Sequence, residues 1–158
     1  MAQGLKITVW GKPIAQARPK FFTRKTKTGK VFSGAYSPQE TDAGRFANAV
    51  ANQLPSGFIP FTGPLELSAR FVMPIPASVS KKKRAAMAAG ETLPAKKPDN
   101  SNCVKWVEDC LNGVVWVDDS LICRILSEKV YGEHPRTEIE VRLIGGANGE
   151  QQVEPIEN

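Results

Sequence analysis

The chain has 158 residues and a formal net charge of +5, with 41% hydrophobic and 23% charged residues. This composition is typical of one globular domain and excludes disordered, collagen-like and coiled-coil classes. No run of about 18 apolar residues and no apolar N-terminal leader is present, so we expect a cytoplasmic protein without a membrane anchor.

The first half of the chain predicts two strands, a loop and a helix. Residues 5–10 alternate between apolar and polar side chains, as a half-buried strand does. Residues 11–36 are rich in Gly, Pro, Lys and Thr and predict a mobile basic loop that orders on its partner, with a hairpin candidate around Thr28 and Gly29. Residues 37–40 fit a capping box, the apolar spacing of 43–54 predicts a helix, and residues 65–72 predict the next strand.

The second half predicts two helices and two closing strands. Residues 80–89 form a short helix with a basic first turn, which the helix dipole disfavours. A third helix begins near residues 99–101 and ends at 112–113, where Gly suits the left-handed position. Residues 121–130 and 137–144 predict a closing pair of strands.

These elements predict a single domain over residues 1–144 followed by a frayed polar tail at residues 145–158. The three cysteines, Cys103, Cys110 and Cys123, are odd in number and lack CxxC spacing. We interpret them as reduced packing residues, which disfavours a disulfide framework and a zinc site.

Charge is distributed unevenly along the chain. Residues 1–98 hold 16 Lys or Arg and 4 Asp or Glu, a net charge of +12, whereas residues 99–158 hold 5 and 12, a net charge of −7. This distribution favours a polyanionic partner, although a Lys run on a short helix can also be a solvated face. The candidate DNA contacts are Arg18, Lys20, Arg24, Lys25, Lys81, Lys82, Lys83, Arg84, Lys96 and Lys97.

Two aromatic residues, Phe21 and Phe22, lie among these basic residues. Core packing is the favoured interpretation for this pair, and stacking on nucleic acid bases is the alternative. The single histidine, His134, lies in a polar turn and is expected in an exposed loop.

The informative acids are Asp99, Asp109, Asp118 and Asp119. Asp99 directly precedes a helix, and the pair Asp118 and Asp119 follows an apolar run that should deliver it to the end of a buried segment. Carboxylates brought together repel one another unless a cation intervenes, and oxygen ligands suit Mg²⁺ or Mn²⁺. The alternatives are a plain helix N-cap for Asp99 and an acidic turn for the other pair. Lys105 and Asp109 are four residues apart and predict a surface pair.

Acids in a basic chain are what a nuclease requires, because cations hold the phosphates and carboxylates hold the metal that activates water. Gly-rich phosphate-binding loops are absent from the sequence, so nucleotide hydrolysis has no support and no nucleotide cofactor is expected.

The segment PAKKPDNSNCVKWVEDCLNGVVWVDDSLI, residues 94–122, resembles the metal-binding segment of the RusA family of Holliday junction resolvases from bacteria, prophages and phages. GKPIAQARPKF, AYSPQET, PIPASVSKKKRAAMAAGE and EKVYGEHPRTEIEVRLI resemble the phage-type members. The resemblance implies an α+β fold, with a small mixed β-sheet and two to three helices. It also implies a homodimer without membrane association that binds four-way DNA junctions and makes paired nicks with Mg²⁺ or Mn²⁺ in DNA recombination and repair.

The resemblance also assigns residues. It places the first metal-binding Asp on Asp99 and the later essential pair on Asp118 and Asp119. It makes Lys105 the residue that holds the scissile phosphate, with Asn102 and Asp109 in supporting roles. The second Asp of the family motif falls on Ser101, whose hydroxyl is a weaker metal ligand or acts through water. Two hypotheses therefore stay open, a metal-dependent endonuclease and a weakly catalytic or non-catalytic branched-DNA binding protein.

Overall fold

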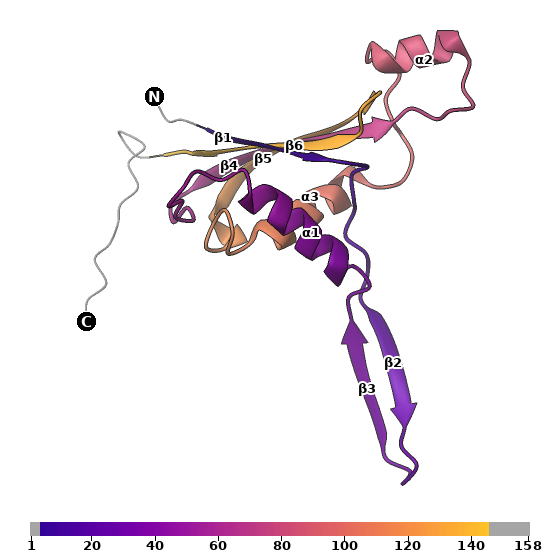
Figure 1. The fold of residues 1–158 in the computed structure, drawn as a ribbon, viewed down its shortest axis with the longest axis vertical. Coiled ribbons are helices and arrows are strands. Elements are labelled where there is room, and N and C mark those ends of the chain that lie inside the picture. Colours follow the sequence, from indigo (N-terminus) through magenta and orange to yellow (C-terminus); the bar gives the residue numbers. More distant parts are fainter. Residues whose placement is uncertain (1–3, 146–158) are drawn as a thin grey trace.

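The computed structural model describes residues 4–145. These residues form a four-stranded sheet, a separate two-stranded ribbon, three α-helices and a short 3₁₀ helix (Figure 1). The strands are β1 (Leu5–Trp10), β2 (Lys20–Lys25), β3 (Val31–Tyr36), β4 (Leu65–Pro74), β5 (Ile122–Gly132) and β6 (Arg136–Leu143). The helices are α1 (Glu40–Ala51), α2 (Lys81–Ala88), α3 (Asn100–Leu111) and η1 (Asp119–Leu121).

The main sheet is mixed, with strand order β1-β6-β4-β5. β6 is antiparallel to both β1 and β4, whereas β5 runs parallel to β4. The two strands expected to close the fold therefore do not pair with each other, because β4 lies between them. A parallel pair needs a crossover connection, and the segment with α2 and α3 supplies it. This connection leaves β5 as an edge strand.

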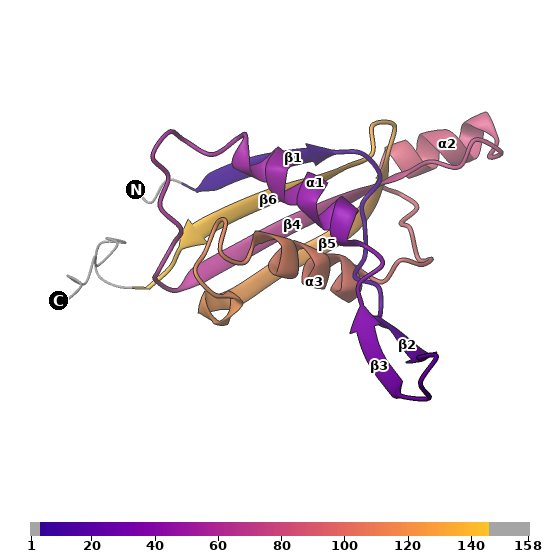
Figure 2. The ribbon, with the colours of Figure 1, turned by 60° about the horizontal axis from the view of Figure 1, so that its bottom comes forward.

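Helices α1 and α3 cover one face of the sheet (Figure 2). The Phe46 and Trp106 rings meet edge to face between the helices, with centroids 6.1 Å apart. Leu65, Leu67, Ala69 and Phe71 alternate toward this face, which confirms the predicted periodicity of β4. The core is therefore a two-layer arrangement that holds α3 rigidly beneath β4 and β5.

The opposite face of the sheet carries charged side chains. Glu66 is buried there between Arg142 and Arg124, whose guanidinium groups donate to its carboxylate at 2.7 Å and 2.8 Å. These hydrogen bonds hold the pKa of Glu66 below its usual range, and the bond from Arg142 has the larger effect. Further along β4, Arg70 Nε forms an ion pair with Glu128 Oε1 on β5 at 2.6 Å. Ion pairs between neighbouring strands thus neutralise the charged side chains on this face, which α1 and α3 do not cover.

The predicted helix of residues 43–54 is confirmed as α1, but its predicted capping box is wrong. The helix begins at Glu40, and the Ser37 hydroxyl accepts only from the Gln39 amide, at 3.3 Å. The Gln39 side chain instead donates to the Ala15 carbonyl at 2.9 Å and accepts from the Ala17 amide at 2.8 Å. A tertiary contact therefore replaces the local cap and fixes the chain that leads into β2.

Residues 11–36, predicted as a mobile loop, contain an ordered ribbon, and the hairpin predicted around Thr28 and Gly29 is confirmed as its turn. β2 and β3 pair over their full length, and the turn between them includes Gly29 at a φ of +84°. The ribbon projects from the body of the molecule (Figure 1). The prediction that Phe21 and Phe22 pack in the core is wrong, because Phe21 is 83% exposed and neither ring belongs to the core cluster.

Helix α2 confirms the prediction of a short basic helix, and Ser80 caps it by accepting from the Lys83 amide. α2, the ribbon and the start of α3 lie toward the same end of the sheet (Figures 1 and 2). His134 is exposed in the β5–β6 turn, as expected. Cys103 is buried, whereas Cys123 is exposed and is not a packing residue.

No helix within residues 4–145 is long and apolar enough to cross a membrane. The predicted frayed tail lies outside the described residues, apart from Gly145.

Candidate active site

Asp99 occupies the N-cap position of α3, but its carboxylate does not cap the helix. The side chain makes no cap hydrogen bond, and only the Asp99 carbonyl accepts from the Cys103 amide. The carboxylate accepts from Lys97 Nζ at 2.9 Å and from Asn102 Nδ2 at 3.4 Å, and it remains 46% exposed. The plain N-cap interpretation is therefore wrong, and this carboxylate is accessible to a ligand.

Strand β5 holds the segment that carries Asp99. Lys129 Nζ donates to the carbonyls of Lys96 and Pro98, at 2.7 Å and 2.8 Å. Asn100 Nδ2 donates to the Ser127 carbonyl at 3.3 Å. Lys129 was not predicted as a site residue, because no spacing in the sequence connects this strand residue to Asp99.

We expect Lys129→Met to destabilise the fold by about 1–3 kcal/mol, because the half-buried carbonyl of Pro98 and the exposed carbonyl of Lys96 both lose a charged donor. Lys6→Met is the matched control, since Lys6 is an exposed strand lysine. Its effect should stay within about 0.5 kcal/mol. Urea unfolding of both variants measures the difference, and equal midpoints would show that Lys129 does not hold the segment.

A second acidic group lies beyond the other end of α3. Asp118 accepts from the hydroxyl and the amide of Ser120, the latter at 3.2 Å. These two bonds, with a smaller contribution from the Asn112 side chain, lower the pKa of Asp118. The apolar run before it is buried at Trp116, so the run delivers Asp118 and Asp119 to the surface as predicted.

Glu108 joins this group and was missed from the sequence. Burial raises the pKa of this half-buried helix residue, and the negative charges of Asp119 and Asp109 raise it further, while Lys105 lowers it. Its i and i+3 spacing from Lys105 was the available signal. Lys105 and Asp109 are both exposed, and within residues 4–145 no ion pair joins them.

The two acidic groups lie at opposite ends of α3. The helix has 12 residues, and at 1.5 Å per residue it is about 18 Å long. Ser101 lies with Asp99 in the first turn, whereas Asp118 follows the last turn. In the described part of the chain, no three His, Cys, Asp or Glu side chains gather as a metal site requires. One subunit alone therefore does not assemble the predicted set of metal ligands.

Most of the predicted DNA-contacting residues lie near the Asp99 end. Lys20, Arg24 and Lys25 are exposed on β2, Arg18 precedes them, and Lys81, Lys82 and Lys83 are exposed on α2. Two of the predicted residues already have partners. Arg84 contacts Glu133 at 3.7 Å and donates to the Pro76 carbonyl, whereas Lys97 is bound to Asp99.

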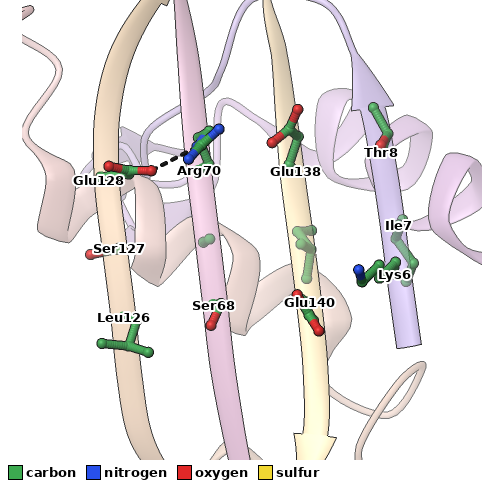
Figure 3. Close-up of a pocket in the computed structure, with 12 residues that line it drawn as sticks. Lys6, Ile7, Thr8, Ser68, Arg70, Leu126, Ser127, Glu128, Glu138 and Glu140 are labelled. Carbon is green, nitrogen blue, oxygen red and sulfur yellow. Dashed lines mark hydrogen bonds and ion pairs between the residues drawn. The ribbon is translucent and has the colours of Figure 1, made fainter. Parts of the chain in front are cut away.

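A depression of about 610 Å³ lies on the face of the sheet opposite α3 (Figure 3). Its walls carry positively charged residues, such as Lys6 and Arg70, and negatively charged residues, such as Glu138 and Glu140. It contains none of the predicted site residues, so the candidate chemistry lies on the helical face.

The model of the family described as "Endodeoxyribonuclease RusA" matches residues 11–142, which include the ribbon and both acidic groups. The chain belongs to the RusA endodeoxyribonuclease family. It is also 35% identical over 142 residues to "Uncharacterized protein YqaN" of Bacillus subtilis (strain 168), across 89% of this chain and 96% of that protein. The mixed α+β architecture expected for a RusA subunit is confirmed.

Proposed function

We propose that this RusA family protein is a metal-dependent, structure-selective endonuclease that nicks four-way and other branched DNA in recombination and repair. The observation that carries the proposal is Asp99, a carboxylate released from helix capping beside an array of exposed cations. Cations that hold phosphates next to a carboxylate that does not cap its helix suit phosphodiester hydrolysis assisted by a hard metal ion.

The separation of the acidic groups supports a homodimer with shared sites. A two-fold axis that places two α3 helices antiparallel brings the Asp99 end of one subunit against the Asp119 end of its partner. β5 is the edge strand nearest α3, and Ile125 and Leu126 on it are 44% and 54% exposed. Exposed apolar residues on an unpaired edge favour pairing with another chain, so this edge is a suitable contact for the second copy.

In this arrangement Asp99 and Ser101 of one subunit, with Asp118 and Asp119 of the other, would hold Mg²⁺ or Mn²⁺. A bound cation of this kind polarises the phosphoryl oxygen and lowers the pKa of bound water. Lys105, exposed on α3 between the two groups, contacts the scissile phosphate. No nucleotide cofactor is required.

Cleavage of a synthetic four-way junction in Mg²⁺ or Mn²⁺ tests the proposal, with EDTA and a linear duplex as controls. We expect nicks near the branch point that depend on the metal. Tight junction binding without cleavage in either metal would instead support the second candidate, a branched-DNA binding protein. The observation that favours this candidate is Ser101 at a position where the family motif has Asp.

Substitution of Ser101 measures its share in metal binding. Ser101→Asp adds a carboxylate next to Asp99 and should lower the Mg²⁺ concentration for half-maximal cleavage, because a carboxylate binds a hard cation more strongly than a hydroxyl does. Ser101→Ala should raise that concentration if the hydroxyl binds the metal or its water. Metal titrations of the three proteins measure both changes. Lower activity in the Asp variant with no change in the Ala variant would remove Ser101 from the site.

A further inference from the structure

One face of the β2–β3 ribbon concentrates aromatic and basic side chains. The strand register places Lys20 opposite Tyr36 and Arg24 opposite Phe32, with Phe22 between the two pairs. Side chains two residues apart on a strand share a face. All five side chains therefore project from the same side of the ribbon, which we call the aromatic face.

The Phe22 ring contacts both other rings of the aromatic face. Phe22 meets Phe32 edge to face at 6.3 Å and Tyr36 at 6.4 Å between centroids. The Arg24 guanidinium lies over the Phe22 ring at 5.5 Å. Gly34 lies opposite Phe22, and a Cβ added there would stand 2.9 Å from the end of the ring. The glycine thus gives Phe22 room to lie across the ribbon and support the outer rings.

The outer rings of the aromatic face are only partly covered within residues 4–145. Phe32 and Tyr36 are each 48% exposed, and no residue of the ribbon belongs to the core cluster. A two-stranded ribbon alone is marginally stable in water. Exposed aromatic residues on such a projecting ribbon are expected to be covered by a binding partner.

The charge of the ribbon favours a polyanionic partner such as nucleic acid. The first 39 residues contain eight Lys or Arg and no Asp or Glu. Each exposed ring lies directly across the ribbon from a cation, Tyr36 from Lys20 and Phe32 from Arg24. A ring that stacks on a base beside a cation that holds the phosphate is the arrangement by which proteins bind unpaired nucleotides. In an intact duplex the faces of internal bases are covered by their stacking neighbours, which favours an unpaired strand over a duplex.

We propose that the aromatic face binds unpaired nucleotides at the branch point of the DNA substrate. Phe32 and Tyr36 stack on exposed bases, and Lys20 and Arg24 contact the adjacent phosphates. The site deepens the proposed function and rests on it. The segment that leads into the ribbon is attached to α3, because the Gln16 amide donates to the Asn102 carbonyl at 3.0 Å. The ribbon therefore starts beside the turn of α3 that carries Asp99.

The test compares the affinity of ribbon variants for a single-stranded oligothymidine and for a linear duplex, measured by fluorescence anisotropy in EDTA so that no cleavage intervenes. The test variant is Phe32→Leu with Tyr36→Leu, which removes both exposed rings and keeps apolar side chains. The matched control is Phe21→Leu, because Phe21 is an exposed ring on the opposite face of the same ribbon. The rescue variant, Phe32→Tyr with Tyr36→Phe, retains both rings.

We expect the double Leu variant to bind the oligothymidine at least about tenfold more weakly, because stacking contributes about 1–3 kcal/mol per base. Its duplex affinity should stay within about threefold of the wild type, while the control and rescue variants keep both affinities. Gly34→Ala, which retains every ring but displaces Phe22, should also weaken oligothymidine binding.

An unchanged oligothymidine affinity in the double Leu variant would overturn the inference. An equal loss for oligothymidine and duplex, or a rescue variant as weak as the Leu variant, would also overturn it. The proposed function fails separately, if the wild-type protein neither binds nor cleaves a four-way junction.

Discussion

Asp99→Asn and Asp119→Asn proteins, each inactive alone, should regain nicking activity when their subunits are combined in one dimer. Each substitution removes one metal-binding carboxylate from both sites of its own dimer. In a mixed dimer with shared sites, one site loses both carboxylates and the other retains both. The second site is therefore complete, and it cuts one strand only.

Random mixing makes about half of the dimers hybrid, each with one of two sites intact, so about a quarter of the wild-type nicking should return. Co-expression of the two chains followed by a nicking assay on a four-way junction measures this fraction. The products should be single nicks, without the paired cuts of the wild type.

Each single variant should also retain junction binding, since loss of a carboxylate near phosphate removes a repulsion when no metal is bound. Sedimentation of the wild-type protein provides the control for dimer formation. Hybrids as inactive as the single variants, despite a stable dimer, would show that the two groups of acids do not act at one shared site.

Junction affinity should fall steeply with salt. Most of the positive charge lies in residues 1–98, and β2 and α2, which carry exposed cations, lie toward the same end of the sheet as the start of α3 (Figure 1). If six or more phosphates are neutralised, released counterions predict a loss of about a thousandfold between about 50 and 200 mM salt. Anisotropy titrations at several salt concentrations give the slope.

Replacement of Lys81, Lys82 and Lys83 by Gln should weaken binding and reduce this salt slope, by about one for each phosphate that the variant no longer neutralises. Lys6→Gln, an exposed lysine on β1 away from α2, is the matched control and should leave the slope unchanged. A wild-type affinity that hardly varies with salt would contradict an electrostatic interface. An unchanged slope in the triple variant would show that α2 is only a solvated helix.

The local elements of this fold were predictable because each has a local physical cause. The alternation of residues 5–10 and 65–72 marked β1 and β4, since one face of each strand is buried. Gly113, at a φ of +78°, follows α3 where a left-handed residue was expected. The exception was the start of α1, where a tertiary contact of Gln39 replaced the predicted cap.

The ribbon shows how far composition predicts residues 11–36. Their Thr and Gly residues marked the turn of the hairpin, but the composition of the rest of the segment predicts a loop, and only the pairing of β2 with β3 makes it regular. Phe21 and Phe22 look like core residues because most large apolar side chains are buried. The register of the ribbon, which is set by pairing rather than composition, places them on two exposed faces instead.

The sequence by itself determined the chemical character of this protein: a basic N-terminal portion, a small set of carboxylates and the motifs of the RusA family. These follow from residue identity and short spacing. Only the tertiary structure decided which groups meet. In the structure the Asp99 carboxylate does not cap α3, and Lys129 holds the segment that carries Asp99. Asp99 and Asp119 lie at opposite ends of α3. These outcomes depend on strand order and helix length in space, because contacts between distant segments are set by packing of the whole domain.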